Sequence, residues 1–308
     1  RYVKSEDAWL HASSSRFRAN GSLAFLGGRM DTTEFKRASH AVWEAMAPGW
    51  DDRHAYFEAS ARPVTERMVA RLAPTPGQAI LELAAGTGVV GLAAAALVMP
   101  GGRVIVSDFS EAMVEAAERR AAELGLENVE CRVLDAERLD LPDASVDGVL
   151  CRWGYMLMAD PEAAFVETRR VLRRGGCLSC AVFAGPEQNP WAGLPSRVLH
   201  ERGHMPPPAA GAPGIMALAD RDRLLPLFAN AGFSEPQIDE VAFLWRFRDP
   251  DDYWDFLTGS AGAIAVVLGR LEDDERERVR EEIAVRTLAF SGADGIELPA
   301  VSLVASAS

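Results

Sequence analysis

Short apolar runs alternate with helical patterns between residues 79 and 183, and this alternation constrains the fold more than any other feature of the chain. The apolar runs cover 79–83, 103–107, 129–134, 146–151 and 177–183, and helical patterns fill 89–98, 111–124 and 161–174. Strands joined through helices by short links form βαβ units. The sequence therefore predicts an α/β fold with a doubly wound parallel sheet, which binds its ligand at the carboxyl ends of the strands.

The segments before this core divide into two parts. Residues 1–30 have no clear period and are treated as an irregular N-terminal extension. Residues 31–73 predict an N-terminal helical cap, in which Asp31 caps a first helix that Pro48 and Gly49 end near Ala47. A second helix is expected over 54–72, with Pro63 tolerated near its start.

The remaining chain, 74–308, is expected to form one domain with two insertions. Many Pro and Gly residues at about 186–220 predict an irregular insertion, and a helical insertion is expected at about 250–290. A helix over 221–231, a strand over 237–247 and a closing strand over 295–305 complete the domain.

Charge and hydropathy restrict the partners. The net charge of −13 argues against nucleic acid, whose phosphates would be repelled. No apolar stretch reaches the ~18 residues that a membrane span needs. The N-terminus lacks the basic-then-apolar order of a signal peptide, so a cytoplasmic location is expected. The oligomeric state stays open between monomer and homodimer.

The segment 81–88, Leu-Glu-Leu-Ala-Ala-Gly-Thr-Gly, carries the chemical signal. Glu82 lies near the end of a strand that runs into a glycine turn and a helix start. Glycines let the backbone approach a ligand, and the helix start presents free N–H groups. Asp108 ends the next strand twenty residues after Gly88, where a carboxylate can accept both hydrogen bonds of a ribose diol.

Two ligands fit this arrangement. Residues 86–91 match G-x-G-x-x-G, so a dinucleotide and a NAD(P)-dependent oxidoreductase must be weighed. Glu82, four residues before the first of these glycines, instead suits the cationic amino-acid moiety of S-adenosylmethionine. Asp135 can accept from an adenine amine, and Met113 can pack on an adenine face.

Segments 81–88, 108–113, 135–136, 141–147 and 171–176 resemble the successive motifs of class I S-adenosylmethionine-dependent methyltransferases, most nearly those of ubiquinone and menaquinone biosynthesis. The resemblance implies a Rossmann-like, seven-stranded doubly wound sheet whose last strand is antiparallel. It departs from the family pattern at Ala84, which stands in place of the first motif glycine. The cofactor-binding residues predicted on this basis are Glu82, Ala84, Gly86, Thr87, Gly88, Asp108, Phe109, Met113, Asp135, Ala136, Cys151, Arg152 and Trp153.

Methyl transfer from a sulfonium is an in-line displacement, whose rate can come from positioning and water exclusion, so no catalytic residue need stand out. The weak candidates for a base are His200, His204 and Tyr155. No metal is expected, because the five histidines lack partners at ligand spacing. Aromatic side chains give large apolar contact with a polar edge, and the predicted acceptor-binding residues are Trp50, Tyr56, Trp191 and Trp245.

The sequence thus predicts O- or C-methylation of a small-molecule acceptor, with an aromatic or quinone-like compound as one candidate, by S-adenosyl-L-methionine. Two alternatives remain: the NAD(P)-dependent oxidoreductase, and a non-catalytic binding protein that keeps the same sheet.

Overall fold

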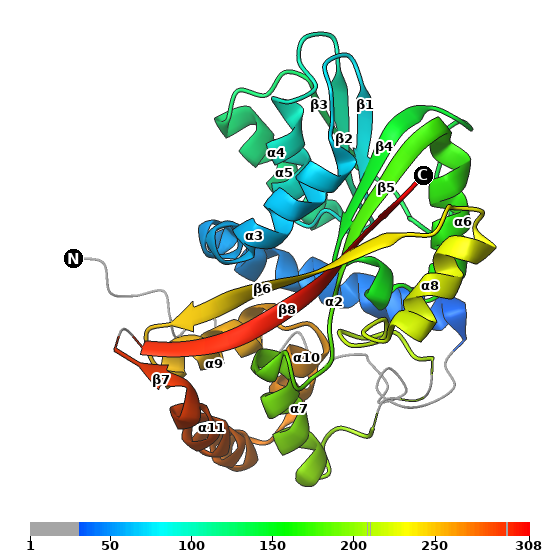
Figure 1. Ribbon diagram of the computed structural model, residues 1–308. Coiled ribbons are helices and arrows are strands. Elements are labelled where there is room, and N and C mark those ends of the chain that lie inside the picture. Colours follow the sequence, from blue (N-terminus) through cyan, green and yellow to red (C-terminus); the bar gives the residue numbers. More distant parts are fainter. Residues whose placement is uncertain (1–30, 208, 210, 294) are drawn as a thin grey trace.

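The computed structural model describes residues 31–207, 209, 211–293 and 295–308 (Figure 1), so the predicted extension over 1–30 lies outside the described residues. The helices are α2 (Thr32–Asp52), α3 (His54–Leu72), α4 (Val89–Ala95), α5 (Glu111–Glu123), α6 (Pro161–Val171), α7 (Pro190–Glu201), α8 (Arg221–Asn230), α9 (Pro250–Ser260), α10 (Ala263–Arg270) and α11 (Asp273–Thr287), with short 3₁₀ turns η2 (Tyr155–Leu157) and η3 (Leu288–Phe290). The strands are β1 (Ala79–Glu82), β2 (Arg103–Asp108), β3 (Val129–Val133), β4 (Val146–Arg152), β5 (Leu172–Phe183), β6 (Gln237–Phe247), β7 (Ser291–Gly292) and β8 (Gly295–Ala307).

The strands form one sheet in the order β3-β2-β1-β4-β5-β8-β6, with the two-residue β7 paired to β8. Strands β1 to β5 run parallel to one another, whereas β8 runs antiparallel to both β5 and β6. The predicted doubly wound sheet with an antiparallel last strand is therefore confirmed, and β7 is a small addition to it.

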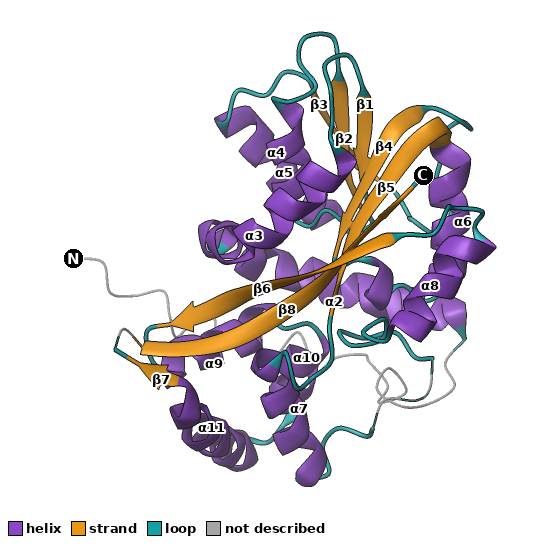
Figure 2. Ribbon diagram, in the orientation of Figure 1, coloured by secondary structure: helices purple, strands orange, loops and turns teal. Residues whose placement is uncertain are grey.

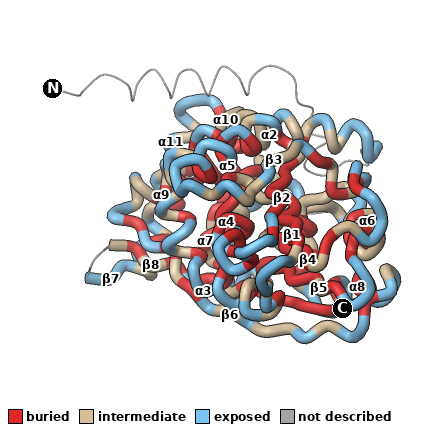
Figure 3. The backbone as a smooth tube through the Cα atoms, turned by 90° about the horizontal axis from the view of Figure 1, so that it is seen from above, coloured by how far each residue is buried: buried red, intermediate tan, exposed pale blue. Residues whose placement is uncertain are grey.

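Helices cover both faces of the sheet. Figure 2 shows α3, α4 and α5 on one side and α6 and α8 on the other. The central strands are buried from both sides, so β1 is an uninterrupted buried run in which Ile80 and Leu81 are at most 1% exposed. Figure 3 shows buried residues along the central strands and exposed ones on the outer helices. No helix in the described part of the chain is long and apolar enough to cross a membrane.

Strands β6 and β8 continue past the carboxyl end of β5. The last β5–β8 pair joins Phe183 to Ser302, but β6–β8 pairing continues from Ala242 with Val301 to Phe247 with Ile296. These two segments, residues 242–247 and 296–301, are called the β6–β8 ribbon. Helices α7, α9 and α11 gather at this extension (Figure 1), so a second packing centre forms beyond the strand ends.

Two expectations about proline were wrong. Helix α2 does not end near Ala47; it runs through Pro48 and Gly49 to Asp52. Proline removes one backbone hydrogen bond, but Gly49 lets α9 approach so closely that a Cβ there would lie 2.5 Å from the Gly259 carbonyl oxygen. Packing against α9 therefore outweighs the local helix-breaking signal. Pro63 stands in the interior of α3, not near its start.

Two segments differ from the expected elements. The helix expected over 161–174 ends at Val171, and Leu172 already begins β5. Gly175 has φ +80°, and the register with β4 shifts between Val146 and Gly148, so a β-bulge absorbs the glycines. The insertion expected to be irregular at 186–220 contains α7, which starts at Pro190, a position that favours proline.

Candidate cofactor and acceptor site

Three carboxylates stand at neighbouring strand ends. Glu82 ends β1, Asp108 ends β2, and Asp135 follows β3. In the sheet, Glu82 lies in register with Val106, and Asp108 with Val133. Parallel strands present their carboxyl ends at one edge, so these side chains share the edge where doubly wound sheets bind ligands.

The turn between β1 and α4 is open to a ligand. Gly86 and Gly88 have φ +54° and +84°, conformations that glycine adopts without strain. A Cβ at Gly86 would meet nothing nearer than Met113 Sδ and the Trp50 ring, both at 4.0 Å. The Gly86 backbone therefore lies beside the two side chains predicted to contact the cofactor and the acceptor, and a methyl-sized group would fit between them.

Ala84 adopts φ +48°, the left-handed conformation, at the position where the family pattern has glycine. That conformation costs a residue with a Cβ ~1–2 kcal/mol. The turn thus keeps the glycine-type backbone despite the substitution, and it stores some strain there.

Glu82 is buried, with 1% exposure, and the Gly91 backbone N–H donates to its Oε2 at 2.7 Å. A Cβ at Gly91 would lie 2.5 Å from that oxygen, so the third glycine of the pattern makes room for the carboxylate. Burial raises the pKa of Glu82 to about 7, against the hydrogen bond from Gly91 and the charge of Arg152, which lower it. The group changes charge near neutral pH.

Asp108 ties the glycine turn to β2. The Gly86 N–H donates to its Oδ2 at 2.8 Å, and the Ser110 N–H donates to its Oδ1 at 3.0 Å. Burial raises the pKa of this carboxyl, and the backbone hydrogen bonds oppose the shift. Each carboxylate oxygen has a second lone pair, so ribose hydroxyls can still be accepted. Phe109 follows, and Ser110 caps α5, accepting from the Met113 N–H.

Helix α2 crosses these strand ends and contributes polar residues that sequence reasoning missed. Lys36 Nζ lies 2.7 Å from Asp135 Oδ2 and 2.8 Å from Glu137 Oε2. Glu44 Oε1 accepts from Ser110 Oγ at 2.6 Å and from the Ala112 N–H at 3.1 Å.

Between them, His40 Nε2 lies 2.8 Å from Glu111 Oε2, and its ring meets Phe109 edge-on at 5.5 Å. The four-residue spacing of positions 36, 40 and 44 marks one helix face and was the available signal. Ligand atoms of His40, Glu44 and Glu111 lie within 4.8 Å of one another, a grouping that hydrogen bonding also explains.

The end of β4 packs against the glycine turn. A Cβ at Gly154 would lie 2.6 Å from Ala84 Cβ and 2.7 Å from Cys151 Sγ. Cys151 is fully buried, which raises the pKa of its thiol to about 12 and makes it a packing residue. Arg152 donates to Thr65 Oγ1 at 2.9 Å and lies 4.9 Å from the Trp153 ring centre. Trp153 itself has φ +61°, a strained conformation at the site.

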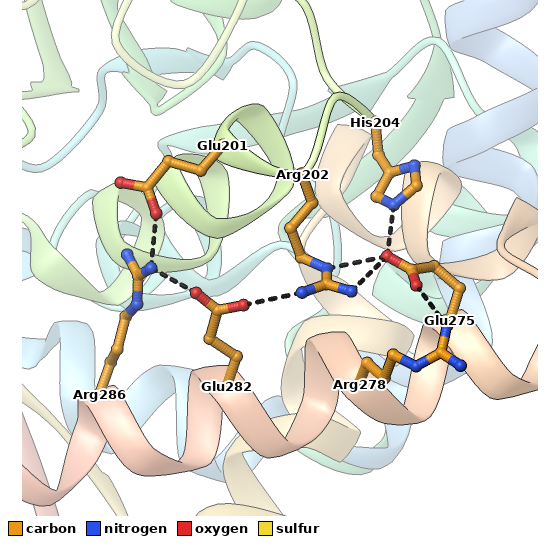
Figure 4. Close-up of polar contacts among 7 residues, drawn as sticks. All are labelled: Glu201, Arg202, His204, Glu275, Arg278, Glu282 and Arg286. Carbon is orange, nitrogen blue, oxygen red and sulfur yellow. Dashed lines mark hydrogen bonds and ion pairs between the residues drawn. The ribbon is translucent and has the colours of Figure 1, made fainter.

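The weak base candidates have partners away from the strand ends. The buried Tyr155 hydroxyl shares a 2.6 Å hydrogen bond with Thr168 Oγ1. His204 Nε2 lies 2.8 Å from Glu275 Oε1, within an ion-pair network between α7 and α11 (Figure 4). His200 Nδ1 lies 3.1 Å from the Met205 carbonyl oxygen. A catalytic role for any of the three stays a prediction.

Large aromatic side chains gather beyond the ends of β4 and β5, along the β6–β8 ribbon. Trp245 is central: its ring centre lies 5.7 Å from that of Trp191, 5.8 Å from Tyr56 and 6.0 Å from Trp153. We call this set the aromatic cluster; its members are Tyr56, Phe57, Trp153, Phe183, Trp191, Phe243, Trp245, Phe247 and Phe256.

Trp50 connects the aromatic cluster to the glycine turn, because it stacks on Phe57 at 4.1 Å and faces Gly86. The four predicted acceptor residues, Trp50, Tyr56, Trp191 and Trp245, are therefore brought together. Sequence reasoning missed the phenylalanines, although the alternation Phe243, Trp245, Phe247 already indicated one buried strand face.

Residues 80–176 match a protein family described as "Methyltransferase domain". Over 125 residues the chain is 39% identical to a demethylmenaquinone methyltransferase of Clavibacter sepedonicus, covering 41% of this chain and 48% of that protein. It is 36% identical over 141 residues to a nocamycin O-methyltransferase of Saccharothrix syringae, covering 44% and 49%. The chain thus spans about half the length of these two relatives.

Fold similarity extends further than sequence similarity. A solved structure from Anabaena variabilis, designated a methyltransferase from an antibiotic biosynthesis pathway, shares 19% identity with a TM-score of 0.54. That match covers 80% of this chain and 96% of the solved one, so the shared fold includes much of the region after residue 176. Residues 80–176 are therefore similar to a methyltransferase domain, and in this region the chain is similar to methyltransferases of quinone biosynthesis.

Proposed function

We propose that this protein transfers the methyl group of S-adenosylmethionine to a small, uncharged acceptor with an aromatic or quinone-like ring. The observation that carries the proposal is the open turn at Gly86, bordered by the carboxylates of Glu82 and Asp108 on one side and linked through Trp50 to the aromatic cluster on the other. A cationic amino-acid nucleoside suits the carboxylates, and a flat apolar acceptor suits the rings.

Each strand end has a role in this proposal. Glu82, when ionised, would hold the ammonium group together with the N–H groups of the turn. Asp108 would accept the ribose hydroxyls, and Asp135 the adenine amine, with Met113 against the adenine face. When bound, the cofactor supplies an electrophilic methyl group on a sulfonium.

Positioning and water exclusion account for the chemistry that this chain itself must supply. Nine aromatic rings pack beyond the end of β4, where an acceptor would face the glycine turn. Holding the acceptor nucleophile in line with the methyl group, in a site closed to water, can supply most of the rate. The related proteins include named C- and O-methyltransferases, so the atom methylated is left open.

Calorimetric titration with S-adenosylhomocysteine and with NADH tests the cofactor assignment. We expect the homocysteine compound to bind and NADH not to bind. Asp108→Asn and Asp135→Asn should each weaken its binding about tenfold, the loss of roughly one charged hydrogen bond. Asp140→Asn, an exposed aspartate in the loop after β3, is the control and should bind like the wild type.

Mass spectrometry of reduced and oxidised naphthoquinones incubated with the cofactor then tests for a methylated product. Tight NADH binding, or S-adenosylhomocysteine binding that neither strand-end variant changes, would overturn the proposal.

A further inference from the structure

We propose that the indole N–H groups of Trp191 and Trp245 are specificity-determining donors that bind a carbonyl oxygen on the acceptor. The inference rests on the proposed function, because it names how that acceptor is recognised. It assigns the acceptor to one chemical class: an uncharged flat ring system that carries at least one carbonyl oxygen at its edge.

Both indole N–H groups are buried without a partner. Trp191 is 4% exposed and Trp245 is 1% exposed, and neither Nε1 has a hydrogen-bond partner in the described chain. Buried donors in folded proteins are nearly always paired, so each exception needs an explanation. Trp191 and Trp245 are two such exceptions, and their ring centres lie 5.7 Å apart. This proximity points to one ligand atom or group that both indole N–H groups share.

Other indoles in the same region are satisfied by the protein. Trp153 Nε1 donates to Ser302 Oγ at 2.9 Å, and Trp50 Nε1 donates to the Ser260 carbonyl oxygen at 3.2 Å. The indole donors of these two tryptophans are therefore satisfied within the protein. Trp191 and Trp245 are left unpaired at the side of the aromatic cluster formed by α7 and β6.

The chemistry of the donors defines their partner. An indole nitrogen only donates, so the partner must be an acceptor atom. The nine members of the aromatic cluster are uncharged rings, and a charged ligand among them would be desolvated without compensation. A carbonyl oxygen on an apolar ring meets both conditions.

The position of the donors agrees with a role in acceptor binding. Trp153 stands between the two parts of the site: its ring lies 6.0 Å from that of Trp245, and the residue after it, Gly154, packs on Ala84 of the glycine turn. An acceptor held by Trp191 and Trp245 would thus extend toward the methyl donor. The two indole N–H groups would bind the carbonyl at the end of the ring system that lies away from the reacting atom.

The test compares two probes of nearly equal shape in the presence of saturating S-adenosylhomocysteine. One is 2,3-dimethyl-1,4-naphthoquinone, whose blocked ring carbons do not add thiols; the other is 2,3-dimethylnaphthalene, which lacks the oxygens. Affinities are measured by equilibrium dialysis for the wild type, Trp191→Phe and Trp245→Phe. Trp254→Phe, a partly buried tryptophan of α9 outside the aromatic cluster, is the matched control.

We expect the wild type to prefer the quinone, and each of the two variants to lose about five- to tenfold in quinone affinity, the loss of one hydrogen bond. Hydrocarbon affinity should change less than about twofold, because phenylalanine keeps an aromatic ring in place. The control should bind both probes as the wild type does. Since the two positions lie on different elements, a folding defect in one variant leaves the other as the test.

Equal losses for both probes would show that the indoles only pack, and would overturn the inference. A wild type that binds both probes equally would do the same. Failure of the wild type to bind S-adenosylhomocysteine is measured separately and would instead overturn the proposed function.

Discussion

Glu82 is the residue in which burial and charge conflict most directly. A carboxylate with 1% exposure is stabilised in its ionised form by the Gly91 N–H at 2.7 Å, yet burial still raises its pKa to about 7. An ammonium group placed beside it would restore the ionised form. The same side chain thus destabilises the ligand-free protein at high pH and provides a charge for the proposed cofactor.

This conflict predicts a pH dependence that Glu82→Gln removes. Because the folded-state pKa of about 7 exceeds the ordinary value of 4.5, the folded state binds the proton more tightly than the unfolded chain. The contribution of Glu82 to the free energy of unfolding should therefore be greatest below pH 4.5 and fall by on the order of 3 kcal/mol as the pH rises to about 7. Glutamine keeps an acceptor for Gly91 but does not titrate.

Urea denaturation of both proteins at several pH values between ~4.5 and ~8 measures the difference. Glu123→Gln, which replaces an exposed glutamate in the last turn of α5, is the control. Its free energy of unfolding should depend on pH as that of the wild type does. If the free energy of unfolding of Glu82→Gln changes with pH as much as that of the wild type, the assignment of this pH dependence to Glu82 is contradicted.

At the scale of single elements, α2 is the most informative helix, because it alone covers three strand ends. Lys36 pairs with Asp135 and Glu137, Glu44 caps α5, and Trp50 faces Gly86. The helix therefore holds the acidic edge of the sheet with residues from both of its halves. Where the proposed cofactor binds, α2 would be its cover.

Removal of the Lys36 ion pairs tests α2 as a cover. In Lys36→Met we expect S-adenosylhomocysteine to associate and dissociate faster by a similar factor of about two to five, so that the equilibrium constant changes little. A partly exposed ion pair contributes up to ~1 kcal/mol to such a closed arrangement. Stopped-flow binding kinetics give both rates. Arg119→Met removes the 2.7 Å ion pair with Asp51, at the other end of α2, and should leave both rates unchanged. A change in the dissociation rate alone would contradict the role of α2 as a cover.

The sequence was sufficient for elements whose signals are local. The strands end within a few residues of their predicted ends because apolar runs stop at Glu82 and Asp108. The sequence was insufficient where contacts between residues far apart in the chain determine the structure. Pro48 sits inside α2 because Gly49 meets Gly259, some two hundred residues away. Lys36 reaches Asp135 by the same kind of long-range packing, which no local pattern reports.

For the whole molecule, the second packing centre beyond the sheet is tied together by charge as well as by aromatic rings. Glu275 of α11 accepts from Arg202 at 2.8 Å and lies 2.8 Å from His204, both at the end of α7, and Arg202 also contacts Glu282 (Figure 4). Arg286 joins Glu282 to Glu201. The network thus fastens α11 to α7, the helix that begins next to the donor Trp191.

Acid should loosen this connection. The hydrogen bonds from His204 and then Arg202 lower the pKa of Glu275 to about 2. A carboxyl with a lowered pKa stabilises the fold above its ordinary value of 4.5, and this contribution disappears as the pH falls toward 2. Glu275→Gln should therefore reduce the hydrogen-exchange protection of α11 about two- to fivefold at neutral pH and low salt, with less effect at high salt. Glu277→Gln, which removes the exposed ion pair between Glu277 and Arg280 within α11, is the control and should change the hydrogen-exchange protection less. Equal loss in both variants would contradict a specific α7–α11 tie.

Strands β6 and β8 each have two parts with different neighbours. The part of the strand pair that lies beside β5 completes the sheet, and the β6–β8 ribbon carries Phe243, Trp245 and Phe247. Successive side chains alternate between faces, so single substitutions at every second position of the ribbon should alter the aromatic cluster without disturbing the hydrogen-bonded register. Under the proposed function, substitutions there are expected to change which acceptor binds without altering the residues proposed to bind the methyl donor.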